Sequence, residues 1–155
     1  MSAPLTPAEH DLVGRAAALA RAAHEGQRDK AGRPYFDSHV ADVHRRVVAY
    51  GGDVHEQVAA LLHDVLEDTE VTEDDLVAAG VPEQAIQVVR LLTKVDGEPV
   101  QAYYERIRAH EPARRVKLLG DLASNTDPAR TALLPEAQRL RLTAKYDQAR
   151  RLLEA

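Results

Sequence analysis

Helix start signals recur at short intervals along this sequence, and they constrain its fold more than any other feature. Thr6-Pro7-Ala8-Glu9 combines a capping hydroxyl, a first-turn proline and a glutamate three residues after the cap. Asp53 with Glu56, and Thr72 before an acidic segment, repeat the capping pattern. Further prolines stand where first-turn prolines of helices are expected, at Pro82, Pro99, Pro112 and Pro135. These signals divide the chain into many short helices.

The segments between these signals have the period of a helix. The apolar residues that follow the first cap lie on one helical face: Leu12, Ala16, Leu19, Ala20 and Ala23. A second helix is predicted from about Ser38 to Tyr50, a third over 54–68, and the last from Pro135 to about Leu153. No segment alternates with the period of two that is typical of strands. We therefore predict one all-α domain over residues 1–155, with about seven or eight helices.

Composition excludes several classes of protein. The 155 residues include no cysteine, so a disulfide framework, an iron–sulfur cluster and a thiolate zinc site are all excluded. The formal net charge is −5, which argues against a nucleic-acid polymer as partner but not against a small phosphorylated ligand. Apolar runs fall short of the roughly 20 residues of a membrane span, and the N-terminus lacks the pattern of a signal peptide. We expect a cytoplasmic protein with no membrane partner.

Acidic residues and a histidine gather at the end of the third predicted helix, in the sequence His63-Asp64-Val65-Leu66-Glu67-Asp68. On one helix, the four polar residues of this sequence would lie on the side opposite the apolar arc. The carboxylates repel one another, and no Lys or Arg lies in this turn to relieve them. A divalent cation would relieve the repulsion, and the nitrogen and oxygen ligands suit Mn²⁺, Fe²⁺ or Zn²⁺. The alternative is a solvated acidic helix end.

A second polar stripe lies further along the chain. Lys117, Asp121 and Asn125 are spaced four residues apart on a predicted helix whose other positions are mostly apolar. A buried polar stripe must find partners, and a metal with its substrate would supply them. The alternative is an ordinary ion pair between Lys117 and Asp121 on the surface.

The order of these residues along the chain resembles that of a known family. His39, the His63-Asp64 pair and Asp121 follow the order His, His-Asp, Asp of the HD-domain phosphohydrolases. The closest likeness is to the hydrolase domain of the RelA/SpoT enzymes and its small single-domain relatives. The likeness extends over roughly 19–130 and includes the sequences Ala-His-x-Gly-Gln, Gly-x-Pro-Tyr, Ala-Leu-Leu-His-Asp-x-x-Glu-Asp-Thr, Leu-Thr-Lys and Val-Lys-Leu-x-x-Asp-x-x-x-Asn.

This resemblance implies a compact HD-type helical fold that holds one divalent metal, commonly Mn²⁺ in this family. The residues that it assigns are His39, His63, Asp64 and Asp121 as metal ligands, Glu67 and Asp68 as catalytic carboxylates, and Lys30 and Asn125 as substrate contacts. Lys94 and Lys117 are weaker candidates for offsetting phosphate charge. HD proteins with two metals draw extra histidines from between the His-Asp pair and the last Asp. Here that interval holds only His110, so a one-metal site is expected.

Three positions depart from the family pattern. The family usually has Pro-Tyr-x-x-His, whereas here three residues separate Tyr35 from His39. Because serine is a poor ligand, we assign His39 rather than Ser38 to the metal, and we expect the loop to absorb the extra residue. Asp29 stands where alarmone hydrolases place an arginine that packs on guanine. The Asp127-Pro128 dipeptide replaces basic and hydroxyl residues that often face the far phosphates.

The resemblance implies a metal-dependent hydrolase of small nucleotide phosphates, with (p)ppGpp 3′-pyrophosphohydrolase activity as the family default. One alternative is a (deoxy)nucleotide phosphatase of the same fold, which Asp29 favours. Another is a non-catalytic sensor that binds a nucleotide, against which the intact Glu67 and Asp68 argue. A structural helical adaptor is a third.

The remaining polar residues receive simpler interpretations. We interpret His10, His44, His55 and His110 as surface residues. His24 is expected to pack or hydrogen-bond beneath the site. The arginines of the last helix are expected to form a solvated or packing face.

Overall fold

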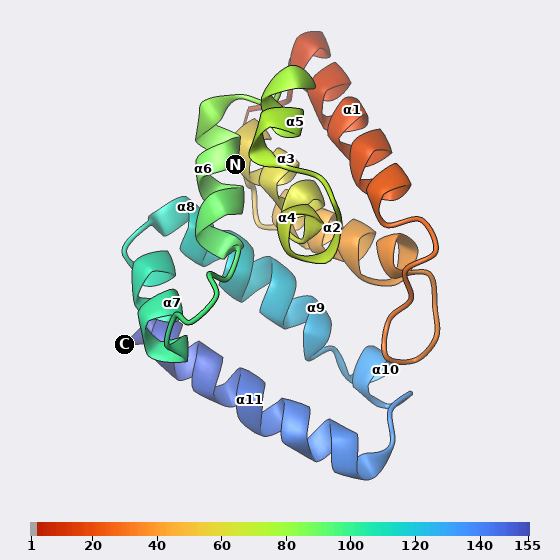
Figure 1. The fold of residues 1–155 in the computed structure, drawn as a ribbon, viewed down its shortest axis with the longest axis vertical. Coiled ribbons are helices and arrows are strands. Elements are labelled where there is room, and N and C mark those ends of the chain that lie inside the picture. The colour runs from red at the N-terminus through yellow and green to blue at the C-terminus, as the bar shows by residue number, and fades with distance from the viewer. Residues whose placement is uncertain (1–2) are drawn as a thin grey trace.

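Helix α3 (Val54–Leu62) lies at the centre of the fold, because nearly every side chain on it is buried. It packs against α1 (Pro7–Ala23), α2 (Ala41–Ala49) and α6 (Glu83–Leu92), which surround it in Figure 1. The long last helix, α11 (Glu136–Glu154), crosses the far end of the molecule and packs against α7 (Val100–Arg108).

The computed structural model describes residues 3–155, and the prediction of an all-α fold is confirmed for them. The remaining helical segments, in chain order, are η1 (Phe36–Val40), α4 (Val65–Asp68), α5 (Glu73–Ala78), α8 (Glu111–Arg115), η2 (Val116–Leu122), α9 (Ala123–Asn125) and α10 (Pro128–Thr131). Over the described residues the only β-type pairing is an isolated bridge between Arg28 and Pro34. Within residues 3–155, no helix combines the length and the apolar character that crossing a membrane demands.

The capping signals begin helices where the sequence predicts them. Thr6, Asp53 and Thr72 each accept a hydrogen bond from the backbone N–H three residues on, and each forms a complete capping box. Pro112 lies in a first helical turn as expected. The prediction is wrong by one position for three other prolines: Pro82, Pro99 and Pro135 are N-caps with extended backbone. An N-cap residue lies outside the helix, so its own N–H takes no part in the helical ladder.

The predicted single helix over 54–68 is interrupted in the structure. Helix α3 ends at Leu62, and α4 begins only at Val65. His63 is the C-cap of the first helix, and Asp64 is the N-cap of the second, with φ −105° and ψ −3°. The four polar residues therefore do not lie on one continuous helix, although the N–H of Asp68 still donates to the carbonyl oxygen of Asp64 at 2.9 Å. Asp64, Glu67 and Asp68 line one cavity.

Two π-helical segments carry the other half of the polar cluster. Segment η1 precedes α2 and contains His39, and segment η2 joins α8 to α9 and contains Asp121. A π turn holds more residues than an α turn, and such turns frequently occur at functional sites. The extra residue between Tyr35 and His39 therefore lies within a helical turn, and the expectation that a loop absorbs it is wrong.

Segment η2 packs closely on α2 at a glycine. A Cβ atom added to Gly120 would lie 3.1 Å from Cγ1 of Val43 and 3.3 Å from Cγ2 of Val47. Both valines are fully buried. Glycine thus permits the approach of the two helices that fixes the position of η2.

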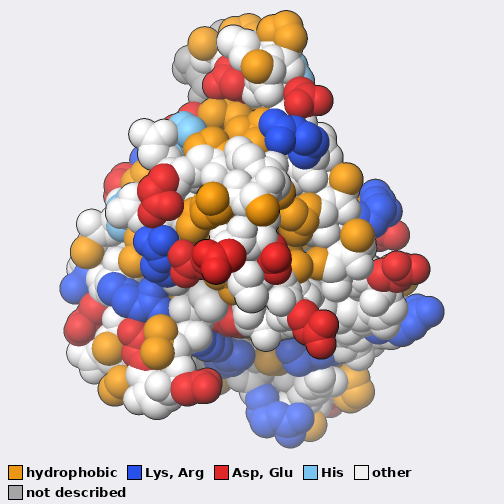
Figure 2. All heavy atoms as spheres, turned by 45° about the horizontal axis from the view of Figure 1, so that its top comes forward, with side chains coloured by type: hydrophobic (Ala, Val, Ile, Leu, Met, Phe, Trp, Pro, Cys, Tyr) orange, Lys and Arg blue, Asp and Glu red, His pale blue; other side chains and the backbone are white. Residues whose placement is uncertain are grey.

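The surface shows no large continuous apolar area on the face drawn in Figure 2, where charged side chains of both signs are interspersed. Of the histidines expected on the surface, His10 is exposed, but His44, His55 and His110 are half-buried. His44 lies 3.3 Å from Oε1 of Gln57, and His110 caps α8 by accepting from the N–H of Ala113. These three side chains are therefore only partly exposed: hydrogen bonds hold His44 and His110, whereas Nδ1 of His55 is buried and has no hydrogen-bond partner among residues 3–155.

Candidate active site

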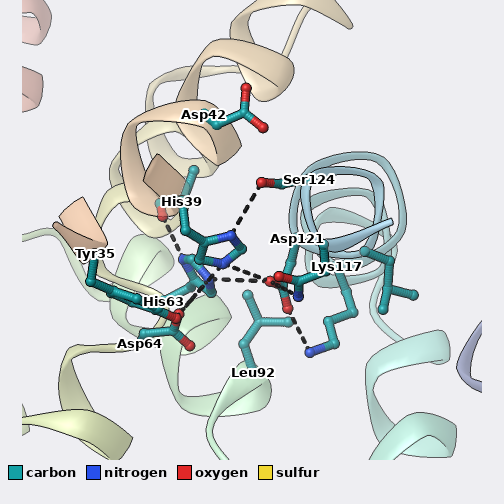
Figure 3. A network of polar contacts seen from close by, with 12 residues as sticks. Tyr35, His39, Asp42, His63, Asp64, Leu92, Lys117, Asp121 and Ser124 are labelled. Atoms are coloured by element: carbon teal, nitrogen blue, oxygen red, sulfur yellow. Dashed lines mark hydrogen bonds and ion pairs between the residues drawn. The ribbon is translucent and has the colours of Figure 1, made fainter. Parts of the chain in front are cut away.

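Four side chains from three parts of the chain converge beneath a cavity (Figure 3). Nε2 of His39 lies 3.0 Å from Oδ1 of Asp121 and 3.7 Å from Oδ2 of Asp64. Nε2 of His63 lies 3.0 Å from Oδ2 of Asp64 and 3.5 Å from Oδ1 of Asp121. The two histidines and Asp121 are buried, and the Asp64 side chain is only 16% exposed. The structure thus brings together all four predicted ligand residues and places Ser38 outside this set of contacts.

The chemistry of His63 fits a bound cation. Its Nδ1 lies 2.7 Å from the carbonyl oxygen of Ala60, which can only accept, so Nδ1 carries the ring proton. In a neutral ring, Nε2 then holds a lone pair that faces the carboxylates of Asp64 and Asp121. Nε2 is buried, and nothing in the described part of the chain hydrogen-bonds to it. A proton or a metal ion on this nitrogen removes the repulsion, and the mixed nitrogen and oxygen donors suit a divalent transition metal.

The pKa values of His63, Asp64 and Asp121 are each shifted by the charges of the other side chains in the cluster. Burial raises the pKa of Asp64, but His63 and the other neighbouring cationic groups hold it below its ordinary value. Burial also raises the pKa of Asp121, but Lys117 and the two histidines hold it well below its ordinary value. Burial lowers the pKa of His63, and the two carboxylates raise it well above its ordinary value. Without a metal, protons and Lys117 supply the compensating positive charge.

A second layer of side chains orients the four. The hydroxyl of Tyr35 donates to Oδ2 of Asp64 at 2.5 Å, and Oγ of Ser124 lies 3.1 Å from Nδ1 of His39. The amide of Asn125 donates to Oδ1 of Asp121 at 3.2 Å. Such partners fix the rotamers and tautomers of metal ligands.

Lys117 forms an ion pair with Asp121, but not at the surface. Its Nζ donates to Oδ2 of Asp121 at 2.7 Å, and both side chains are largely buried. The alternative interpretation as an ordinary surface pair is therefore wrong. Burial lowers the pKa of Lys117, but Asp121 raises it well above its ordinary value, so the lysine stays charged.

The two predicted catalytic carboxylates line the cavity beside this cluster. Oε1 of Glu67 accepts from the backbone N–H of Lys94 at 2.5 Å. Oδ2 of Asp68 accepts from the amide of Gln27 at 3.1 Å. Oε1 of Gln27 in turn lies 2.7 Å from Nδ1 of the buried His24, which confirms that His24 hydrogen-bonds beneath the site.

The cavity above the cluster has a volume of about 420 Å³ and a basic rim. Lys30 and Asn125, the predicted substrate contacts, both line it, and so do Lys94 and Lys117. Its volume falls in the range of about 300–1,000 Å³ that is usual for small-molecule sites. The positive side chains of the rim suit an anionic ligand, and a cation held by the acidic cluster would attract the same ligand from below.

The departures from the family pattern have structural roles here. The Asp29 carboxylate is almost fully buried and accepts from the backbone N–H groups of Ala31 and Arg33, both at 2.9 Å. It orders the loop over 26–35 rather than presenting a planar group to a ligand. Asp127 caps α10 by accepting from the N–H of Ala129, and it forms an ion pair with Arg46.

Sequence reasoning missed several residues that line the cavity. Gln27 and Tyr35 belong to matched sequence stretches, but their roles as hydrogen-bond partners of Asp68 and Asp64 are visible only in three dimensions. Lys145 and Tyr146 come from the distant helix α11, where no periodicity separates them from surface residues.

A family comparison identifies a known domain in the chain. The model of the family described as "HD domain" matches residues 16–153. Among curated proteins, the chain is 42% identical over 72 residues to the guanosine-3′,5′-bis(diphosphate) 3′-pyrophosphohydrolase of Vibrio cholerae, a match that covers 46% of this chain and 10% of that protein. It is 29% identical over 144 residues to the protein of the same name from Aquifex aeolicus, with 90% of this chain and 20% of that protein covered.

A solved structure has a similar fold. It is described as a metazoan ortholog of SpoT that hydrolyzes ppGpp and plays a role in starvation responses. The TM-score is 0.78 with 22% sequence identity, and the match covers 97% of this chain and 88% of that one. The chain spans a fifth or less of the length of the two curated relatives, so these matches concern one part of those proteins.

Proposed function

The chain belongs to the HD domain family, and we propose that it hydrolyses small nucleotide phosphates as a metal-dependent 3′-pyrophosphohydrolase of (p)ppGpp or a close relative. The observation that carries this proposal is the convergence of His39, His63, Asp64 and Asp121 beneath a cavity with a lysine rim. The activity for which the two curated relatives are named supports the choice of substrate.

In this proposal, His39, His63, Asp64 and Asp121 hold one divalent cation, with Mn²⁺ as the preferred ion. The bound cation would lower the pKa of water and offset phosphate charge. Support comes from three groups whose donor atoms lie within 4.8 Å of one another, namely His39, His63 and Asp64, and from the lone pair of His63. The interval from Asp64 to Asp121 brings no further histidine into this set, which fits a single ion.

Glu67 and Asp68 are the proposed catalytic carboxylates. The attacking water forms a bond to the phosphorus that carries the nucleoside 3′-oxygen, and one of these carboxylates takes its proton. The bond between this phosphorus and the 3′-oxygen breaks, and the 3′-oxygen takes the proton back from the carboxylate, so the 3′-hydroxyl is restored and pyrophosphate is released. The backbone N–H of Lys94 holds Glu67, and the amide of Gln27 holds Asp68, so each keeps its orientation while it accepts a proton.

The remaining polar residues of the cavity are proposed to bind substrate. Lys30 and Lys94 contribute positive charge at the rim, and Asn125 contributes an amide beside Asp121. Lys117 already neutralises Asp121, so we assign it to balancing the negative charge of the metal-binding cluster rather than to direct phosphate binding. The partner is a small nucleotide, and a cysteine-free chain of net charge −5 fits an activity in the reducing cytoplasm, away from nucleic-acid polymers.

A (deoxy)nucleotide phosphatase of the same fold is the second candidate, and one observation favours it. Asp29 occupies the position where alarmone hydrolases carry an arginine that packs on guanine, and here its carboxylate is committed to the loop backbone. The sensor alternative is less well supported, because Glu67 and Asp68 both line the cavity and are both held by hydrogen bonds.

The test is release of phosphate and pyrophosphate in the presence of Mn²⁺. The panel holds ppGpp and the common nucleoside triphosphates and monophosphates, with Asp64→Ala as the inactive control. We expect pyrophosphate from ppGpp and none in the variant. Release of phosphate from simple nucleotides alone would establish the second candidate. Tight binding of Mn²⁺ and nucleotide without any turnover would instead establish the sensor.

A further inference from the structure

A second cavity adjoins the one above the polar cluster. It has a volume of about 510 Å³, and it shares four lining residues with the first: Lys94, Tyr103, Tyr104 and Lys145. Its other walls include the apolar side chains of Val95 and Val100, both more than half exposed, and the acidic side chains of Asp96 and Glu98. The two cavities are therefore neighbours, separated by a boundary of two lysines and two tyrosines.

The boundary concentrates positive charge that has no carboxylate partner within residues 3–155, although Nζ of Lys94 lies 5.7 Å from the ring centroid of Tyr103 and Nζ of Lys145 lies 5.6 Å from that of Tyr146. Between residues 3 and 155, no carboxylate lies within 4.0 Å of the ammonium groups of Lys94, Lys145 or Lys30, whereas Lys117 is paired with Asp121. Burial lowers the pKa of Lys145, and the charges of Lys94, Lys30 and Lys117 lower it further. Unpaired like charges held close together cost free energy unless an anion binds among them.

The chemistry of the second cavity differs from that of its boundary. Asp96 would repel a phosphate on the far side and Glu98 is already paired with Arg106, while Val95, Val100 and the buried tyrosines offer apolar contact. An uncharged planar group fits such walls better than an anion does. The boundary thus suits a phosphate, and the space beyond it suits a base.

We propose that Lys94 and Lys145 bind a second phosphate group of the substrate, remote from the one that is cleaved, and that the second cavity takes the nucleobase. This inference rests on the proposed function and extends it, since it assigns Lys145 of α11 to substrate recognition. It also replaces the guanine contact that Asp29 cannot make: the base lies on the side of α7 and α11 rather than on the loop over 26–35.

The first experiment compares two substrates that differ only in the remote group. Wild type and Lys145→Met are assayed on guanosine 3′,5′-bis(diphosphate) and on guanosine 3′-diphosphate, which lacks the 5′ phosphates. We expect KM for the first substrate to rise about tenfold with kcat within about twofold, because one charge-assisted hydrogen bond is lost. The preference for the first substrate over the second therefore falls about tenfold. Lys145→Arg should restore most of it.

Arg151→Met is the matched control, since it removes one exposed positive charge from the same helix and lines neither cavity. Equal loss of preference in Lys145→Met and Arg151→Met would overturn the assignment, because it would show a general effect of net charge. Unchanged preference in Lys145→Met would overturn it as well.

The second cavity is tested by filling it. Val100→Trp places a large side chain at its wall, and we expect a rise in KM of at least about fivefold for both substrates, since both carry the base. Val77→Trp, at a similarly exposed valine of α5 outside all of these walls, is the control. An equal KM in Val100→Trp and Val77→Trp would contradict placement of the base there.

A binding measurement separates failure of this inference from failure of the proposed function. Calorimetric titration of guanosine 3′,5′-bis(diphosphate) in EDTA needs no turnover, and we expect about tenfold weaker binding to Lys145→Met than to wild type. If wild type binds the nucleotide but never hydrolyses it, the proposed function fails while the subsite stands. If wild type and Lys145→Met bind it equally, the subsite fails whatever the activity.

Discussion

The floor and the rim of the cavity above the polar cluster differ in how their charges are balanced. On the floor, His39, His63, Asp64 and Asp121 are buried and every one of them contacts another member of the set. On the rim, Lys30, Lys94 and Lys145 are exposed and pair with no carboxylate of the described chain. The floor is thus a unit in which opposite charges stabilise one another, whereas the rim consists of like charges that repel one another and have no carboxylate partner.

This difference determines how much activity or binding a single substitution in each region is expected to remove. Loss of one member of a coupled buried cluster leaves the others uncompensated, so the whole unit fails. Loss of one exposed charge weakens binding by about tenfold or less, because solvent screens it. The following predictions test the contrast from its largest expected effect to its smallest.

The largest effect is expected from Asp121→Asn, which keeps the shape of a floor residue and removes its charge. Hydrolysis should fall by at least about 10³-fold, because a proposed metal ligand and the partner of Lys117 are lost together. Elemental analysis of the purified variant should show loss of bound metal. Asp147→Asn, at an exposed position of α11, is the control. Full activity in Asp121→Asn would show that the floor is not a coupled unit.

A smaller but still large effect is expected from Gly120→Val, which acts on the floor only through packing. The added side chain meets Val43 and Val47, so the free energy of unfolding should fall by about 1–3 kcal/mol. Urea titration measures this loss. Gly14→Val is the matched control, because nothing lies within 4 Å of a Cβ there. Equal stability of the two variants would contradict the close contact between η2 and α2.

Gln27→Leu tests whether Asp68, one of the two proposed catalytic carboxylates, also depends on a supporting hydrogen bond. It removes the hydrogen bonds of Gln27 to Asp68 and to His24 and leaves the four floor residues in place. We expect kcat to fall by about tenfold with little change in metal content, because a mispositioned carboxylate transfers a proton less well. Gln101→Leu, on the exposed face of α7, is the control. A loss of metal in Gln27→Leu would place this residue in the floor instead.

The smallest expected effect is a pH dependence of stability that belongs to the floor alone. The pKa values of Asp64 and Asp121 are lowered by folding, so their contribution is present above about pH 4 and is lost as the pH falls. The pKa of His63 is raised, so its contribution is full below about pH 6.5 and is lost as the pH rises through the raised value.

In EDTA, Tm should therefore pass through a maximum between about pH 4 and pH 6.5, measured by differential scanning calorimetry. With Mn²⁺ present, the maximum should move to higher pH, because the cation replaces the protons of the histidines. Lys145→Met should leave the position of the maximum where it is in the wild type. A shift of the maximum in that variant would show that the rim is coupled to the floor.

The sequence predicts the floor better than it predicts the rim, and the reason is physical. The pair His63-Asp64 is contiguous, and Lys117, Asp121 and Asn125 share one helical stripe, so local spacing already indicates a common site. Lys145 approaches Lys94 only because α11 packs against α7, and nothing in its local sequence marks that contact. A contact such as this one, between segments far apart in the sequence, produces no regular spacing from which it could be predicted.

The sequence also did not predict the places where the helices break or change from α to π geometry. Spacing by 100° per residue treats 54–68 as one helix, whereas the chain turns at His63 and Asp64. The π turns around His39 and Asp121 likewise insert a residue that no propensity predicts. These irregular turns are what bring the four polar side chains to one point.

Calorimetric titration of Mn²⁺ into protein that has been stripped with EDTA tests the central claim most directly. The account predicts one ion bound per chain in the wild type, with the binding abolished in Asp64→Ala although that variant stays folded by circular dichroism. Two ions per chain, or binding that persists in the folded variant, would contradict the claim that these four residues form a single metal centre.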